Sequence, residues 1–199
     1  MNRPYIISHM MTSVDGRIDC GMTAKLPGVE EYYATLNELN LTATLSGRVT
    51  AQLEMAKQGE FVARTKEPLN IEKFSKKMSA EEYSIVVDTK GCLLWPEHSM
   101  TPLIIITSEA VAKEYLAYLD EKNISWIACC KERINLTRAM EILTEEFGVK
   151  RLGIVGGGTI NAGFLNEGLL DEISILLAPG IDGRKGMTAV FDGLPMETE

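Results

Sequence analysis

The chain has few cysteines and histidines and no long apolar run. Its four cysteines form no C-x-x-C pair, and its two histidines, His9 and His98, stand far apart in the sequence. We therefore expect no metal site, and the cysteines are typical of reduced thiols in a cytosolic protein. No run of about 18 apolar residues exists, so no membrane span is expected. Residues 1–5 lack the apolar centre of a signal peptide, and we predict a cytoplasmic protein.

Basic residues are also too few for a nucleic-acid partner. Twenty Lys and Arg stand against 28 Asp and Glu, which gives a net charge of −8. Nothing supplies the basic stripe that a phosphate backbone requires, so we expect a small-molecule substrate instead. The phosphates of a cofactor need only a few nearby hydrogen-bond donors, so a net charge of −8 does not exclude a nucleotide cofactor. A chain of 199 residues with 45% hydrophobic content can form one domain, 1–199, with a substantial core.

Short apolar segments alternate with amphipathic ones along the chain. Strands are predicted over residues 5–11, 41–45, 84–88, 102–107, 125–129, 152–155 and 171–177. Helices are predicted over 28–39, from about 46 to 56, and over 108–121, 136–147 and 160–167. The polar region 59–82 is expected to be a surface excursion, partly disordered. This alternation predicts an α/β fold with a mostly parallel central sheet flanked by helices.

The most informative segment is a run of glycines between a predicted strand and a predicted helix. Gly156, Gly157 and Gly158 follow the strand, and Thr159 and Ile160 open the helix. A turn without side chains lets the backbone approach a ligand closely, while the N–H groups and the dipole of the helix favour an anion. A phosphate or pyrophosphate fits such a turn, which indicates a nucleotide cofactor.

Two other interpretations of the glycine run exist. The glycines can serve only to make a tight, well-packed strand-to-helix turn. The run can also be compared with the Rossmann fingerprint, which needs glycine at its first, third and sixth positions. Its sixth position here is Asn161, and the turn lies close to the C-terminus rather than at the start of its domain. The segment therefore favours a different dinucleotide-binding fold.

A second segment with phosphate-binding character is Gly47-Arg48-Val49-Thr50. Glycine allows a close approach, arginine offers a fork of donors, and threonine provides a hydroxyl at a helix start. Alone, this segment is an ordinary helix start with a solvated arginine. Together with the glycine run it can hold one pyrophosphate, and Arg48 can meet an extra phosphate, which favours NADPH over NADH.

A third segment, Thr12-Ser13-Val14-Asp15-Gly16-Arg17-Ile18, places small polar groups directly after the first strand. In open α/β sheets, ligands bind beyond the carboxyl ends of the strands. Ser13 and Asp15 are therefore predicted to contact the substrate, and Asp15 is the candidate proton donor. The alternative is a turn in which the aspartate bonds its own backbone.

These segments together resemble the dihydrofolate reductase superfamily. The resemblance rests on the three segments above and on Val87-Asp88-Thr89, and it spans nearly the whole chain in the right order. The similarity is greatest to the riboflavin-biosynthesis reductases (the RibD C-terminal domain family), which Gly168-Leu169-Leu170-Asp171-Glu172-Ile173, Pro179 and Gly183 also fit. It implies a three-layer fold with a central, mostly parallel sheet, and an NADP-dependent oxidoreductase that is a homodimer.

The resemblance also implies site residues. Those expected to contact NADPH, including the ones proposed above from the glycine-containing turns, are Thr12, Gly47, Arg48, Thr50, Glu54, Thr89, Gly156, Gly157, Gly158, Thr159 and Ile160. Glu54 stands where the riboflavin enzymes usually carry aspartate. Val155 stands where they commonly carry a substrate-contacting glutamate, and the strand at Val86 lacks a preceding arginine. The family also continues after Pro195 into a strand or hairpin at the sheet edge, which this chain is predicted to lack.

The predicted activity is hydride transfer from NADPH to a small heterocycle or a ribosylamino-pyrimidine, as in the reductase that acts on 5-amino-6-(5-phosphoribosylamino)uracil. The proton comes from water or from a carboxyl group, with Asp15 as the first candidate and Glu30 or Glu31 as alternatives. The glutamates are also explained as the solvated face of a helix. Two other functions stay open: a dihydrofolate reductase proper, and a non-catalytic nucleotide-binding protein with the same fold.

Overall fold

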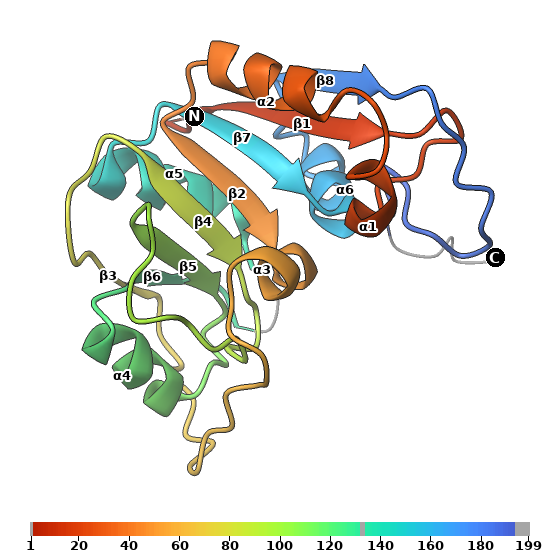
Figure 1. Cartoon of the computed structure of the whole chain (residues 1–199). Coiled ribbons are helices and arrows are strands. Elements are labelled where there is room, and N and C mark those ends of the chain that lie inside the picture. The colour runs from red at the N-terminus through yellow and green to blue at the C-terminus, as the bar shows by residue number, and fades with distance from the viewer. Residues whose placement is uncertain (1, 132–133, 194–199) are drawn as a thin grey trace, which may run out of the picture.

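The computed structural model describes residues 2–131 and 134–193. Its centre is an eight-stranded sheet in the order β3-β6-β5-β4-β2-β7-β1-β8 (Figure 1). Every neighbouring pair is parallel except β3 with β6. The predicted α/β class with a mostly parallel sheet is therefore confirmed. The strands are β1 (Tyr5–Thr12), β2 (Ala43–Gly47), β3 (Lys73–Ser75), β4 (Tyr83–Val87), β5 (Leu103–Thr107), β6 (Ser125–Ala128), β7 (Arg151–Gly156) and β8 (Glu172–Leu177).

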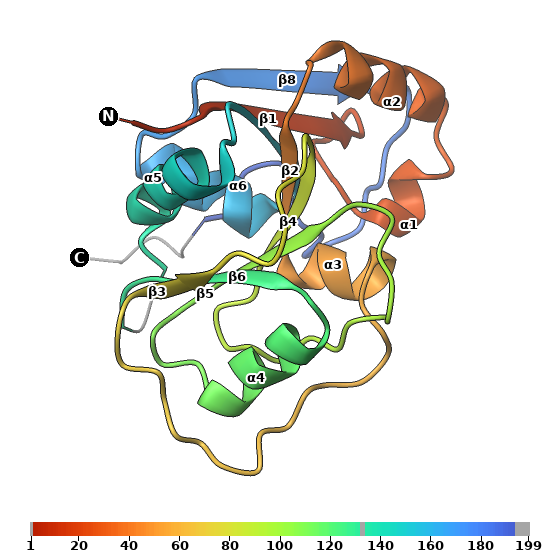
Figure 2. The same ribbon diagram turned by 90° about the vertical axis from the view of Figure 1, so that its left-hand side faces the viewer.

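Helices cover both faces of the sheet, so the molecule has three layers (Figure 2). One face carries α5 (Leu136–Phe147) and α6 (Gly158–Asn166), and the other carries α2 (Val29–Glu38), α3 (Arg48–Glu54) and α4 (Lys113–Glu121). Two apolar clusters fill the spaces between the layers. The short helix α1 (Cys20–Thr23) lies in the connection after β1. None of the described helices is long and apolar enough to cross a membrane.

The sequence pattern predicts the inner elements well because burial dictates their composition. All residues of β5 are buried, as expected for a strand covered by helices on both faces. In α5, the side chain of Asn135 accepts a hydrogen bond from the N–H of Arg138 at the first turn. Gly148 ends the same helix with a φ of 72°. Both ends of α5 match the prediction.

Some connections differ from their predictions. The region 59–82 is largely exposed, as expected, but it contains the edge strand β3, which pairs antiparallel with β6. α4 begins at Lys113 rather than near 108, because residues 108–112 form a turn in which the N–H of Val111 donates to the carbonyl of Ser108. The predicted lack of a final edge strand concerns the chain after Pro195, outside the described residues. Within the described residues, β8 is the last strand at its edge of the sheet.

Candidate functional site

Two glycine-containing turns meet at the carboxyl ends of neighbouring strands. β2 and β7 pair in parallel, and Ser46 lies opposite Gly156 in the register. The chain leaves β2 into α3 on one face of the sheet and leaves β7 into α6 on the opposite face (Figure 2). Because the two helices diverge, the ends of β2 and β7 form a switch point, the place where open α/β sheets bind ligands.

The first turn of α6 presents main-chain donors at this point. The first hydrogen bond within the helix runs from the N–H of Asn161 to the carbonyl of Gly157, at 3.1 Å. The N–H groups of Gly158, Thr159 and Ile160 therefore have no acceptor within the helix. Gly157 offers no side-chain cap. An anion placed here would accept hydrogen bonds from these groups and would be favoured by the helix dipole.

Protein packing explains some of these glycines but not Gly157. A Cβ atom on Gly158 would overlap the carbonyl oxygen of Ala189, and one on Gly47 would approach Ile160 to 2.7 Å. Gly156 has a φ of 150°, which side chains rarely allow. A Cβ on Gly157 would meet only the hydroxyl of Thr50, at an ordinary 3.7 Å. The φ of Gly157 is −105°, a value open to any residue, so its φ and the surrounding space both allow a Cβ atom.

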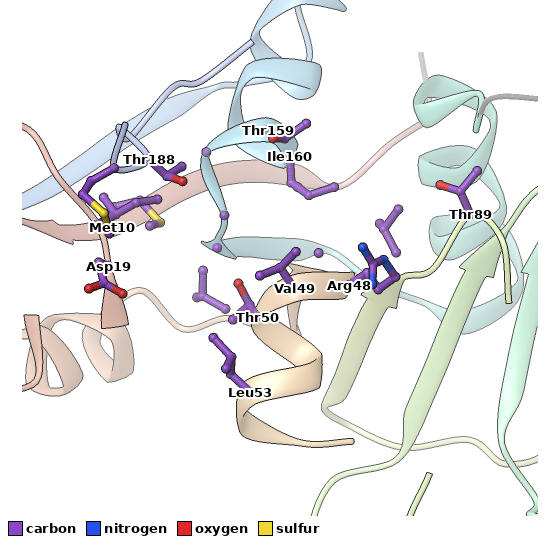
Figure 3. Close-up of a pocket in the computed structure, with 18 of the residues that line it drawn as sticks. Met10, Asp19, Arg48, Val49, Thr50, Leu53, Thr89, Thr159, Ile160 and Thr188 are labelled. Atoms are coloured by element: carbon purple, nitrogen blue, oxygen red, sulfur yellow. The ribbon is translucent and has the colours of Figure 1, made fainter. Parts of the chain in front are cut away.

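The glycine turns form one wall of a cavity of about 700 Å³, a volume typical of small-molecule sites. Thr50 lies at its centre, between Arg48 and Thr89 at one end and Met10, Asp19 and Thr188 at the other (Figure 3). The structure thus brings together nine of the predicted cofactor residues around one cavity: Gly47, Arg48, Thr50, Thr89, Gly156, Gly157, Gly158, Thr159 and Ile160. Val155, where the riboflavin enzymes commonly carry glutamate, also lines it.

Two predicted cofactor residues lie outside this cavity lining. Thr12 is buried at the end of β1, and its hydroxyl donates to the carbonyls of Ser13 and Arg17. Glu54 is exposed at the end of α3. Both are close to the cavity along the chain but do not belong to its wall.

The predicted substrate residues Ser13 and Asp15 are engaged in holding loops together. The carboxylate of Asp15 accepts hydrogen bonds from the N–H groups of Asp182 and Gly183, each at 3.0 Å, and from the hydroxyl of Ser13 at 2.7 Å. These donors hold the pKa of Asp15 well below its usual range. A carboxyl group kept ionised is a poor proton donor, and neither residue lines the cavity, so this placement argues against both predicted roles.

The alternative proton donors, Glu30 and Glu31, are exposed in the first turn of α2 and do not line the cavity. Their position agrees with the solvated face of a helix. His9, a further titratable group, is buried in β1. Its ring stacks on Tyr32 and contacts the hydroxyl of Ser174 at 2.9 Å, and burial lowers its pKa.

Sequence reasoning missed the cavity residues that distant loops contribute. Lys90 follows Thr89 at the end that holds Arg48, and Cys92 lies close enough to interact electrostatically with both Arg48 and Glu60. Asp19, Ile18, Leu53 and Met187 also line the cavity. The polar segment Thr12–Ile18 stops one residue short of Asp19, and nothing in the sequence indicates that residues 187 and 188 return to the end of β1.

A buried carboxylate holds the turn that carries Thr89, Lys90 and Cys92. Asp88 is fully buried and accepts from the N–H groups of Cys92 and Leu93, at 2.8 Å and 2.9 Å, and from the hydroxyl of Tyr115 at 3.1 Å. Burial and the nearby Asp88 raise the pKa of Cys92 to about 11, so its thiol stays protonated. The motif Val87-Asp88-Thr89 thus shapes this end of the cavity through Asp88.

Comparisons with known proteins agree with this architecture. The model of the RibD C-terminal domain family matches residues 4–199. Among solved structures, RibD of Acinetobacter baumannii superposes with a TM-score of 0.65 at 18% identity, over 100% of this chain and 52% of that one. The chain therefore spans about half the length of that protein.

Shorter structures are similar over most of their length. A pyrimidine reductase-like protein of Corynebacterium diphtheriae gives a TM-score of 0.67 at 17% identity, covering 96% of this chain and 81% of that one. A riboflavin biosynthesis reductase of Saccharomyces cerevisiae gives 0.63 at 18% identity, covering 100% and 81%. These likenesses confirm the fold that the resemblance implied.

Proposed function

The chain belongs to the RibD C-terminal domain family, and on that premise we propose that it is an NADPH-dependent reductase of the riboflavin-biosynthesis pyrimidine type. The observation that carries the proposal is the absence of a side chain at Gly157, in the wall of the cavity. Its neighbours in the fold leave room for a side chain, yet the turn has none and opens on the cavity. A ligand that lies against the backbone at this point explains the missing side chain.

The cavity residues fit the parts of a dinucleotide. Main-chain N–H groups at the start of α6 would bind the pyrophosphate, together with the hydroxyl of Thr50. Arg48 and Lys90 both line the cavity and are exposed, and neither forms an ion pair with another residue of 2–131 or 134–193. These two cations would bind the phosphate that distinguishes NADPH from NADH.

The opposite end of the cavity would receive the nicotinamide ring and the acceptor. It is lined by the apolar side chains of Met10, Ile18 and Met187, which suit a flat ring and exclude water. When bound, NADPH supplies the hydride, and the protein supplies position and polarity. Asp15 and the α2 glutamates lie outside the cavity lining, so we propose that water delivers the proton.

We also propose that the protein is a homodimer. The edge strand β8 exposes Ile173, Ile175 and Leu177, which are 49%, 46% and 63% accessible and alternate with less exposed residues. An apolar row on an edge strand is a surface that a second copy can cover. Light scattering should give a mass near 44 kDa, twice the chain mass of 22.0 kDa.

The test is a pair of measurements on the whole protein. Titration with NADPH and with NADH, followed by cofactor fluorescence, should give the tighter dissociation constant for NADPH. Oxidation of NADPH is then followed with ribosylamino-pyrimidines and with dihydrofolate. Turnover of a pyrimidine supports the proposal, and turnover of dihydrofolate alone favours a dihydrofolate reductase. NADPH binding without turnover favours a nucleotide-binding protein, and the absence of NADPH binding refutes the proposal.

A further inference from the structure

The two ends of the cavity carry opposite charges. Arg48 and Lys90 line the end assigned to the adenosine phosphate, where Glu60 is the acidic lining residue. Asp19 is the charged side chain that lines the opposite end, beside Met10 and Thr188 (Figure 3). If the cofactor lies as proposed above, Asp19 stands where the hydride acceptor binds. The inference below rests on that placement.

The backbone around Asp19 fixes its position. The carbonyl of Asp19 accepts from the N–H groups of Met22 and Thr23, at 3.0 Å and 2.8 Å, which ties the residue to the turn of α1. The preceding residue, Ile18, is held by its N–H bond to the carbonyl of Thr188, at 3.2 Å. These backbone hydrogen bonds therefore fix the main chain that carries Asp19 at the cavity wall.

Only one of the two carboxylate oxygens of Asp19 accepts a hydrogen bond from a described residue. Its Oδ2 accepts a hydrogen bond from Nη2 of Arg184 at 2.6 Å, while Oδ1 accepts none from any described residue. The guanidinium of Arg184 is shared, because it also donates to both carboxylate oxygens of Asp182. One cation thus faces two carboxylates, and this small group keeps a net negative charge. A carboxylate has about four acceptor sites, so Asp19 can accept further N–H donors from a ligand.

We propose that Asp19 recognises the acceptor, and that the acceptor is a heterocycle that presents N–H donors at this end of the cavity. An amino-substituted pyrimidine ring would lie between the apolar side chains and donate to Oδ1 of Asp19. Charge-assisted hydrogen bonds of this kind are strong and fix orientation.

The first test measures binding without turnover, on the protein saturated with NADP⁺. The probes are 2,4-diaminopyrimidine, which offers N–H donors, and 2,4-dimethoxypyrimidine, which has the same ring and none. Calorimetry should show tighter binding of the diamino compound to the wild type. Asp19→Asn should weaken that binding at least tenfold, since one charged hydrogen bond is lost, and should leave the dimethoxy compound unaffected. Equal binding of both probes to the wild type, or no effect of Asp19→Asn, overturns the inference.

Arg184→Gln is the matched control for a purely structural role of the ion pair. It removes the partner of Asp19 but leaves the carboxylate in the cavity, so affinity for the diamino compound should stay the same or rise. A loss equal to that of Asp19→Asn would mean that the ion pair only positions the loop, and would overturn the inference.

NADPH titration of Asp19→Asn separates a failure of this inference from a failure of the proposed function. Unchanged NADPH affinity with altered acceptor binding supports both, whereas a protein that binds no NADPH fails the proposed function itself.

Discussion

Gly157 offers the sharpest test of the site, because the effects of a side chain on folding and on binding are separable there. Gly157→Ala adds one methyl group at a φ of −105° and a ψ of −172°, two dihedral angles that any residue can adopt. Its nearest neighbour would be the hydroxyl of Thr50, at 3.7 Å. The substitution also reduces the entropy of the unfolded chain, so the free energy of unfolding should stay constant or rise by roughly 0.4–1 kcal/mol.

The same methyl group should oppose the cofactor. It would occupy the space where a phosphate approaches the N–H groups of α6, and we expect the dissociation constant of NADPH to rise at least tenfold, which is about 1.4 kcal/mol. Urea unfolding measures the first effect, and NADPH fluorescence titration measures the second. Stable protein with weakened NADPH binding is the expected result.

Two neighbouring glycines provide matched controls. Gly163→Ala places its Cβ 3.5 Å from Leu136 inside α6, away from the cavity. It should stabilise the protein by roughly 0.5–1 kcal/mol and leave NADPH binding unchanged. Gly158→Ala would overlap the carbonyl oxygen of Ala189 and should destabilise the fold by about 1–3 kcal/mol. If Gly157→Ala binds NADPH as tightly as Gly163→Ala does, the turn does not contact the cofactor and the reasoning fails.

Three further predictions concern other parts of the site. Replacing both Arg48 and Lys90 with Gln should weaken NADPH binding by roughly tenfold or more and leave NADH binding nearly unchanged, as two parallel titrations would show; equal losses for both cofactors would contradict the assignment. Asp88→Asn should lower the free energy of unfolding by about 1–3 kcal/mol, because the amide group cannot accept from all the donors that face the fully buried carboxylate; denaturant unfolding with no change would contradict the role of this network. Asp15→Asn should lower stability near neutral pH. Since the folded state lowers the pKa of Asp15, the stability that its carboxylate contributes is present above the ordinary pKa of 3.8 and is lost as the pH falls further. The unfolding free energies of wild type and variant should therefore converge in acid. A constant difference at all pH values would contradict the stabilising role of the hydrogen bonds from residues 182 and 183 to Asp15.

Local sequence patterns predict those parts of the fold that depend on local chemistry. β5 is apolar throughout because helices cover it on both faces, and α5 begins at Asn135 and ends at Gly148 because those residues satisfy helix ends. The glycine run predicts the turn at β7 because few side chains tolerate its conformation or its close contacts. In contrast, β3 has only three residues and no distinctive pattern, and its pairing with β6 depends on a contact between distant segments.

The same distinction holds for the site. The turns Gly47–Thr50 and Gly156–Ile160 are visible in the sequence because their chemistry is contained in consecutive residues. The polar segment after β1 also predicts that Ser13 and Asp15 face a ligand. In the structure, the backbone N–H groups of residues 182 and 183 donate to Asp15 and engage it within the protein. Asp19 and Lys90 have no local pattern that distinguishes them from the other charged residues of the chain.

The sequence by itself therefore determined the alternation of strands and helices, the bare turns and the class of ligand that they favour, because each depends on residues adjacent along the chain. Only the tertiary structure decided which polar groups line the cavity and which are used within the protein. That outcome depends on the parallel register of β2 with β7, and on how the segments after β4 and β8 fold back over the ends of the strands. Such long-range packing brings together residues that lie far apart in the sequence, and their local sequence patterns do not predict these contacts.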